Sequence, residues 1–304
     1  MTTKPIKDMP TSVHRRLLNV ARESGRPFNE VLQYYALERF LYRLSKSPFR
    51  DRFILKGALM LLVWKAPVSR PTRDVDLLGW VPNDLEGVRS IMTEIGQHAV
   101  EDDGLVFDVS RIVAEAITQE AEYVGIRVSF PGYLGKARVA MQIDIGFGDV
   151  ITPLPIRIVY PAILDFPNAE LQGYNRETSV AEKFQAMTKL GLLNSRMKDF
   201  FDIWLLSEYF AFQARPLADA IRHTFEARGL EVLPEPECFS ARFVQDESKI
   251  AQWKGFIRKS RLGESPADFS QVVERVRLFL QPIAIGIVEH RPAAMTWPPG
   301  GLWH

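Results

Sequence analysis

The sequence predicts an α+β fold, in which a helical lead precedes a mixed β-sheet and helices form the second half of the chain. Apolar residues recur every three to four positions over residues 11–47, the period of an amphipathic helix. Between residues 105 and 147 the period changes to two, which is typical of half-buried strands. From about residue 177 helical spacing returns and strand signals largely vanish. We therefore expect two domains, 1–165 and 166–304.

The lead is expected to contain two helices. Thr11 is a plausible N-cap, because a hydroxyl can accept a hydrogen bond from the first turn. Gly25 interrupts the apolar pattern, which resumes from Phe28 to Leu44 as a second apolar stripe. Two helices separated by a turn at Gly25 follow from this spacing.

A strand, a turn and a helix are expected in the segment FILKGALMLLVW (53–64), with the tight point at Gly57. The loop APVSRPT (66–72) follows. RDVDLLGW (73–80) is rich in Val and Leu and is expected to be a strand. Residues 83–99 return to a helical period.

Three further segments alternate between apolar and polar residues: LVFDVSRI (105–112), YVGIRVSF (123–130) and ARVAMQIDIGF (137–147). In the last segment alternate apolar residues share one face, and Asp144 lies on the other face. Helical patterns then follow at 177–191, 195–209, 215–228, 247–261 and 266–283.

Composition narrows the function classes. The chain has 304 residues, a formal net charge of +1, 46% hydrophobic and 25% charged residues, and a single cysteine. No overall positive field attracts nucleic acid, so any such affinity would need a local basic surface. One cysteine excludes an internal disulfide and fits a cytoplasmic location. No segment reaches the roughly 18 apolar residues of a membrane helix, so we expect no membrane association.

Common sequence motifs are absent. The five histidines are scattered and match no zinc-ligand pattern. The chain contains no GxGxxG, GxxxxGK[ST], GxSxG or HExxH motif, which removes the enzyme classes that depend on them.

Asp74 and Asp76 are the first candidate metal ligands. They are two residues apart on an expected strand, so both side chains point to one face. Such close carboxylates repel each other unless a cation compensates, and Mg²⁺ prefers carboxylate oxygen. An Asp-x-Asp alone is nearly uninformative in a chain of this length. Asp144 on a second strand completes a set of three if the two strands are neighbours, and Asp149 is the fallback third ligand.

Gly57 permits a close backbone approach, and at a helix start it would leave N–H groups free for a phosphate. A plain strand-to-helix turn is the alternative interpretation. The segment is separated from Asp74 by one helix and one loop.

A second group of charges lies on the two helices of ETSVAEKFQAMTKLGLLNSRMKDFFDIWLL (177–206). The helix carrying Asp199 and Asp202 is apolar nearly all round and is expected to be buried. Buried aspartates need partners, and Lys183 and Arg196 are the candidates. Lys183 is then either oriented towards a nucleotide phosphate or part of a structural clamp. Lys198 is also spaced to pair with Asp202.

Four segments in this order closely resemble the AbiEii-like nucleotidyltransferase toxins: LKGALMLLVW, RPTRDVDLLG, QIDIGFGD and AEKFQAM…NSRMKDFFDIWLL. These toxins are the enzymatic halves of bacterial type IV toxin–antitoxin and abortive-infection systems. The resemblance covers roughly residues 10–210. It departs from polymerase-β-type enzymes at Gly57-Ala58, where Gly-Gly or Gly-Ser is usual, so a hydroxyl that could bind phosphate is missing.

The resemblance implies a polymerase-β-like fold with a helical C-terminal part. It implies Mg²⁺, with Mn²⁺ as a substitute, at Asp74 and Asp76, and a nucleotide-contacting Lys183 with a partner at Asp199 or Asp202. Relatives add nucleotides from an NTP to RNA, including tRNA 3′ ends, and a separately encoded antitoxin usually accompanies them. The full expected nucleotide-binding set is Lys56, Gly57, Arg70, Thr72, Lys183, Arg196, Lys198, Asp199 and Asp202, and the expected catalytic set is Asp74, Asp76, Asp144 and Lys183.

Three functions remain open at this point. The first is nucleotidyl transfer to RNA, and the second is transfer to a protein or small molecule, as in adenylylation or antibiotic modification. The third, a non-catalytic binding module, is disfavoured by the three carboxylates. A local tRNA-binding face could be formed by basic residues near the N-terminus, although such residues more often form a solvated surface: Arg15, Arg16, Arg43, Lys46, Arg50 and Arg52.

Overall fold

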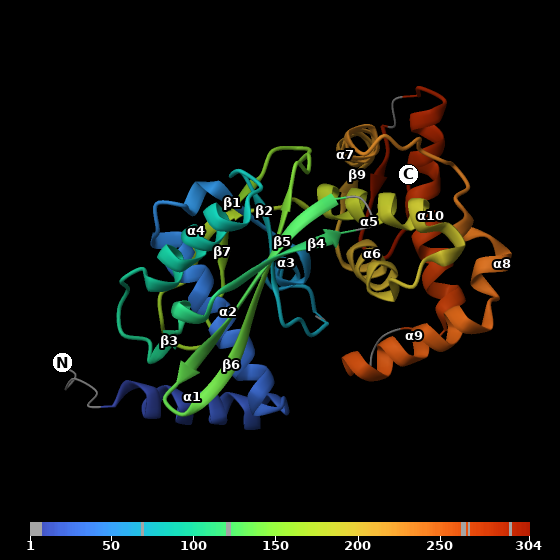
Figure 1. Cartoon of the computed structure of the whole chain (residues 1–304). Coiled ribbons are helices and arrows are strands. Elements are labelled where there is room, and N and C mark those ends of the chain that lie inside the picture. Colours follow the sequence, from blue (N-terminus) through green and yellow to red (C-terminus); the bar gives the residue numbers. More distant parts are fainter. Residues whose placement is uncertain (1–7, 68–69, 120–122, 263–265, 267, 292–293) are drawn as a thin grey trace. The chain divides into compact units, whose positions relative to one another are not determined.

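In the computed structural model the chain divides into two compact units (Figure 1). The structure describes residues 8–67, 70–119, 123–262, 266, 268–291 and 294–304. The first unit comprises Met1–Val63, Thr72–Gly148 and Arg157–Gly173, and the second comprises Trp64–Pro71, Asp149–Ile156 and Tyr174–His304. Some expected elements include positions outside the described residues: 1–7 in the N-terminal segment, 68–69 in the loop and 267 in the last helix.

A mixed β-sheet organises the first unit. Among the described residues it has eight strands in the order β3-β5-β6-β2-β1-β8-β7, with β4 paired to β5 beside this path. The strands are β1 (Phe53–Lys56), β2 (Val75–Gly79), β3 (Leu105–Phe107), β4 (Val113–Gln119), β5 (Tyr123–Leu134), β6 (Ala137–Phe147), β7 (Ile156–Tyr160) and β8 (Ala169–Gly173). β2 lies between β6, to which it is parallel, and β1, to which it is antiparallel. The two strands with the candidate carboxylates are therefore neighbours.

The alternation in β6 has the expected effect on burial. Met141, Ile143 and Ile145 are fully or almost fully buried, whereas Arg138 and Ala140 on the opposite face are exposed. A strand with one apolar face is fixed in register, because a slip of one residue would turn that face to solvent. The periodicity therefore fixes the face on which Asp144 lies.

The helices of the first unit are α1 (Met9–Ser24), α2 (Phe28–Lys46), α3 (Met60–Val63) and α4 (Leu85–Gln97). α1 begins earlier than expected, because the carboxylate of Asp8 accepts a hydrogen bond from the backbone N–H of Thr11 and acts as the N-cap. Gly25 ends this helix in the left-handed conformation with φ of 67°, as a glycine can do without strain. The helix expected after Gly57 is a single turn, preceded by a 3₁₀ turn over Gly57–Leu59.

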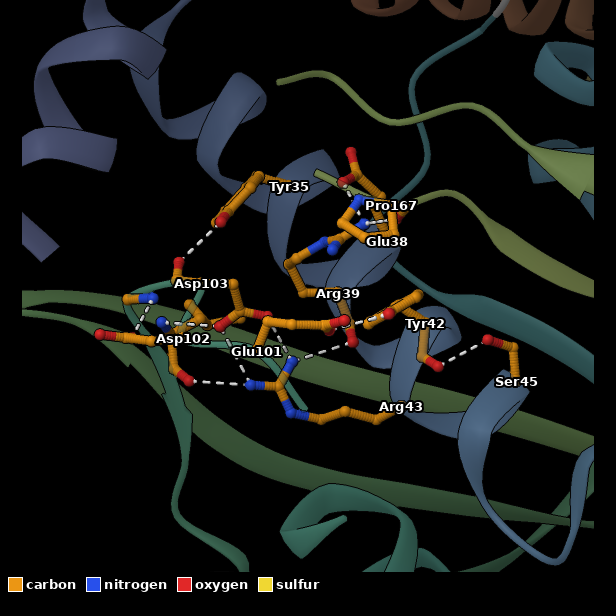
Figure 2. A network of polar contacts seen from close by, with 12 residues as sticks. Tyr35, Glu38, Arg39, Tyr42, Arg43, Ser45, Glu101, Asp102, Asp103 and Pro167 are labelled. Atoms are coloured by element: carbon orange, nitrogen blue, oxygen red, sulfur yellow. Dashed lines mark hydrogen bonds and ion pairs between the residues drawn. The ribbon is translucent and has the colours of Figure 1, made fainter. Parts of the chain in front are cut away.

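A buried polar network attaches α2 to the segment around Asp103 (Figure 2). The guanidinium of Arg43 donates to both carboxylate oxygens of Asp103, at 2.7 and 3.0 Å. Arg39 forms an ion pair of 2.8 Å with Glu38, and the second oxygen of Glu38 accepts from the backbone N–H of Ile163 at 2.7 Å. Burial raises the pKa of Glu38 to about 7, although the charge of Arg39 opposes this.

This network corrects the expectation that Arg43 belongs to a basic RNA-binding face. Its side chain is only 8% exposed, and its donors are used by Asp103 and by the carbonyl of Leu105. A guanidinium that is both buried and paired in this way does not reach a phosphate in solvent. Of the other basic residues proposed for that face, Arg15, Lys46 and Arg52 are exposed.

The second unit is mainly helical. Its helices are α5 (Arg176–Leu190), α6 (Met197–Tyr209), α7 (Ala214–Ala227), α8 (Ala241–Val244), α9 (Glu247–Ser260) and α10 (Phe269–Val288). α5 packs on α6 and α7, and α10 packs on α6 and α7. A small antiparallel sheet joins β9 (Phe212–Gln213) to β10 (Thr296–Trp297). Among the described residues, no helix combines the length and apolarity needed to cross a bilayer.

Several parts of the sheet differ from the expectation. The strand expected at 105–112 ends at Phe107, because Asp108 accepts hydrogen bonds from Ser110 and Arg111 and starts a 3₁₀ turn. β4, β7 and β8 were not expected. In β8 the segment AELQG carries little strand signal, but it pairs in parallel with β1. Long-range pairing outweighs weak local preference in such a strand.

Candidate metal centre

Three carboxylates meet where β2 and β6 run side by side. Asp76 and Asp144 lie directly opposite each other in this parallel pair. Asp74 precedes β2 by one residue, and its side chain lies on the same side as that of Asp76. One oxygen from each of the three carboxylates lies within 4.8 Å of the others. The condition set by the sequence, that the two strands be neighbours, is met.

Gly57 lies against the Asp76 carboxylate. Its φ is +73°, and a Cβ atom built on it would lie 2.7 Å from the Asp76 Cγ. Both the backbone conformation and the available space therefore require glycine. In the β1–β2 pair Lys56 is opposite Asp76, so the end of β1 places a basic residue and a glycine beside this carboxylate.

Thr72 orients the first carboxylate. Its hydroxyl donates a hydrogen bond to Asp74 Oδ1, and its backbone N–H donates to the hydroxyl oxygen of Tyr34 on α2 at 3.2 Å. Thr72 is itself buried. The position of Asp74, which lies outside regular secondary structure, is thus fixed by side-chain hydrogen bonding from the preceding loop.

Arg127 on β5 contacts the third carboxylate. It lies opposite Asp144 in the antiparallel β5–β6 pair. Its Nε donates to Oδ1 at 2.8 Å and its Nη2 to Oδ2 at 2.7 Å. Hydrogen bonding to Asp144 raises the pKa of Arg127 above its ordinary value, against the opposing effect of burial.

The three residues fit a hard divalent cation. The cluster offers only carboxylate oxygens, from Asp74, Asp76 and Asp144, and oxygen donors select Mg²⁺ or Mn²⁺ over softer metals. Asp74 and Asp76 are partly exposed, whereas Asp144 is buried, so the cluster is open on one side. A cation here would offset the mutual repulsion of three nearby negative charges.

Within the second unit, Lys183 lies between two buried aspartates. Its Nζ is 3.1 Å from Asp199 Oδ1 and 2.9 Å from Asp202 Oδ2. Arg196 Nε contacts the other oxygen of Asp199 at 2.5 Å. Arg70 donates to both oxygens of Asp202, at 2.9 and 3.1 Å. Both aspartates, and not one of them, are therefore partners of Lys183.

These contacts explain how the aspartates remain charged. Burial opposes ionisation of Asp199, yet the charges of Lys183 and Arg196 outweigh it and hold its pKa below the usual range. Asp202 follows the same pattern, with Arg70 as its stronger cationic neighbour. For Lys183, burial lowers the pKa, but the two carboxylates reverse the effect and leave it raised. The group is a well-compensated ionic network.

The remaining expected residues have other surroundings. Lys198 is exposed, while both oxygens of Asp202 are contacted by Arg70 and Lys183. Asp149, the fallback ligand, belongs to the second unit and forms an ion pair of 2.9 Å with Arg228. Its carboxylate is not part of the three-carboxylate cluster.

Arg127 is the residue of this centre that sequence reasoning missed. It lies in the expected strand 123–130, and an arginine in an alternating strand normally belongs to a solvated face. Only the register between β5 and β6 shows that it lies opposite Asp144. The alternation in each strand predicts that Arg127 and Asp144 lie on polar faces. It does not predict that the two residues are paired across the strands.

Comparison with known proteins gives one family match. The family model described as "Nucleotidyl transferase AbiEii toxin, Type IV TA system" matches residues 39–275. No curated protein matches the chain significantly. Among solved structures, the chain is similar to a candidate nucleotidyltransferase of Helicobacter pylori, with 11% identity, a TM-score of 0.46 and coverage of 86% of this chain and 97% of the other. It is also similar to JHP933 of Helicobacter pylori, with 11% identity, a TM-score of 0.43, and coverage of 83% and 90%.

Proposed function

Because the chain belongs to the AbiEii family of nucleotidyl transferase toxins of type IV toxin–antitoxin systems, we propose that it transfers a nucleoside monophosphate from an NTP to RNA. The acceptor is the 3′ end of tRNA, and the metal is Mg²⁺ or Mn²⁺. The observation that carries this proposal is the register of β2 and β6, which sets Asp76 opposite Asp144 and beside Asp74.

Asp74, Asp76 and Asp144 would hold the metal. A divalent cation bound there would orient the triphosphate, lower the pKa of the attacking hydroxyl and neutralise charge on the leaving pyrophosphate. Thr72 fixes the orientation of Asp74 through its hydroxyl. Gly57 leaves room for the Asp76 carboxylate. In the overall reaction the acceptor hydroxyl oxygen bonds to the α-phosphorus, pyrophosphate leaves, and the hydroxyl proton passes to solvent.

The Lys183 network supports nucleotide binding in this proposal. Within the second unit, Lys183 offers a positive charge to a nucleotide phosphate, while Asp199 and Asp202 keep the ammonium protonated, and Arg70 and Arg196 keep the aspartates ionised. Replacing Lys183 with Gln should raise the KM for NTP more than it lowers kcat. An unchanged KM in a folded variant would make the network purely structural.

The reaction is tested by incubating the purified protein with each α-³²P-labelled NTP, Mg²⁺ and total bacterial RNA. We expect label on a tRNA-sized band with one NTP preferred. Asp76→Asn should lose more than about 100-fold of this activity, since even weaker perturbations of metal shells cost 10–100-fold. Asp51→Asn is the matched control, because Asp51 is an exposed aspartate of the same unit.

Each result has a defined meaning. Equal labelling by the wild type and Asp76→Asn would refute the carboxylate site. Label on protein, or triphosphate consumption with no labelled RNA, would show that the acceptor is a protein or a small molecule and not RNA.

The toxin role has its own test. We propose that this chain acts in the cytoplasm and is neutralised by a separately encoded antitoxin. Induced expression of the wild type alone should arrest bacterial growth, whereas Asp76→Asn should not. Co-expression of the adjacent gene product should restore growth, and continued arrest would contradict that partner.

A further inference from the structure

Arg127 uses the same oxygens that a metal at Asp144 would need. Its Nε and Nη2 donate to Oδ1 and Oδ2 of Asp144, so the fork of the guanidinium covers the carboxylate from one side. The Asp144 side chain is 8% exposed and that of Arg127 is 34% exposed. The carboxylate is thus almost fully buried, while the arginine borders solvent.

The arrangement places two kinds of cation in competition. Asp144 Oδ atoms complete the cluster with Asp74 and Asp76, and a guanidinium beside them lowers the affinity for a divalent cation by charge repulsion and by sharing its lone pairs. A guanidinium fork fits phosphate oxygens as well as it fits a carboxylate. A triphosphate arriving with the metal therefore offers Arg127 a replacement for Asp144.

We propose that Arg127 couples metal binding to nucleotide binding: it competes with a lone metal ion for Asp144 and transfers its hydrogen bonds to the phosphate chain when metal and NTP arrive together. The inference rests on the proposed function of the carboxylate cluster. It makes metal and nucleotide binding cooperative, and such coupling is reciprocal by thermodynamic necessity. The competition between Arg127 and the metal for Asp144 would weaken metal binding in the absence of the nucleotide substrate.

Metal binding tests the proposal without any turnover. Mn²⁺ affinity is measured from the free-ion electron paramagnetic resonance signal, first with Mn²⁺ alone. The affinity for preformed Mn²⁺–tripolyphosphate, a base-free phosphate chain, is then measured by calorimetry. Arg127→Gln should bind Mn²⁺ alone about tenfold more tightly and Mn²⁺–tripolyphosphate about tenfold more weakly than the wild type, the change expected for one charge-assisted bidentate contact.

Two further variants complete the experiment. Arg138→Gln is the matched control, because Arg138 is an exposed arginine on β6 of the same sheet, and it should change neither affinity. Arg127→Lys keeps the charge but cannot form the fork, so it should shift both affinities in the direction of Gln by a smaller factor. It also serves as the test variant if Arg127→Gln does not fold.

The outcomes separate this inference from the proposed function. If Mn²⁺ binds equally to the wild type and to the Arg127 variants, and Asp76→Asn abolishes binding, the metal centre stands and the coupling role of Arg127 is wrong. If the Arg127 variants lose affinity for Mn²⁺ alone, Arg127 only positions Asp144, and the competition is wrong. If no variant and no wild type binds Mn²⁺, the metal centre fails, and the inference fails with it.

Discussion

Replacing Gly57 with alanine tests whether this glycine exists to make room for the Asp76 carboxylate. Gly57 has φ of +73°, and an added Cβ would lie 2.7 Å from Asp76 Cγ and 2.8 Å from Asp76 Cβ. Atoms at those distances overlap, so the Asp76 side chain or the β1 end must move. Because Asp76 is one of three converging carboxylates, that movement disturbs the proposed metal centre.

The cost of Gly57→Ala has two parts that can be separated. An alanine in the left-handed region costs about 1–2 kcal/mol, and overpacking against Asp76 adds about 1–3 kcal/mol. Gly25→Ala carries only the first part, since Gly25 has φ of +67° and no atom within 4 Å of an added Cβ. We therefore expect Gly57→Ala to lose about 1–3 kcal/mol more stability than Gly25→Ala.

Both stabilities are measured by urea unfolding, and both glycines lie in the first unit, so the same transition reports on each variant. Mn²⁺ affinity and nucleotidyl transfer are then measured on the folded proteins. A shift of about 1 Å in a catalytic group can cost roughly 100-fold in rate, so Gly57→Ala should lose activity and Gly25→Ala should not.

The reasoning is refuted if the two alanine variants lose equal stability and Gly57→Ala keeps its Mn²⁺ affinity. In that case the space around Asp76 does not depend on Gly57. A loss of stability at Gly57 with unchanged Mn²⁺ affinity would instead show that β1 moves and Asp76 stays.

Three other changes have defined outcomes. Mg²⁺ at about 100 times its Kd should stabilise the wild type by about 2.7 kcal/mol in thermal melts and should not stabilise Asp76→Asn. Lys183→Met should cost about 3–5 kcal/mol in urea unfolding, because Asp199 and Asp202 lose a buried partner. Burial raises the pKa of Glu38 from its ordinary 4.5 to about 7, so the folded state keeps a proton that the unfolded chain releases. Stability should therefore fall as pH rises through this window, and Glu38→Gln should flatten that dependence.

Each of these expectations can fail. Equal Mg²⁺ stabilisation in Asp76→Asn would place the metal elsewhere. For Lys183, adding Asp199→Asn should recover part of the loss, and full additivity of the two changes would show that the pair does not interact. For Glu38, a wild-type stability that stays constant or rises between pH 4.5 and 7 relative to Glu38→Gln would contradict the protonation assigned to it.

Several features follow from the sequence alone because they depend on local geometry. The period of β6 places Asp144 on the face opposite Ile143 and Ile145, and the Asp-x-Asp spacing places Asp74 and Asp76 on one side. Apolar residues lie on nearly all sides of α6, which predicts that its two aspartates are buried and need cationic partners. These features follow from the 3.6-residue period of a helix and the two-residue period of a strand. Both periods are local and do not depend on which element packs against the helix or strand.

Tertiary structure decided everything that depends on which strand lies beside which. The parallel register of β2 and β6 makes one cluster of two separate motifs, and the register of β5 sets Arg127 against Asp144. β8 forms a strand because β1 pairs with it. Arg43 is not part of a basic surface, because its side chain is buried in an ion pair with Asp103. Pairing register and charge partnership arise from contacts between residues far apart in the chain, and no local period encodes such contacts.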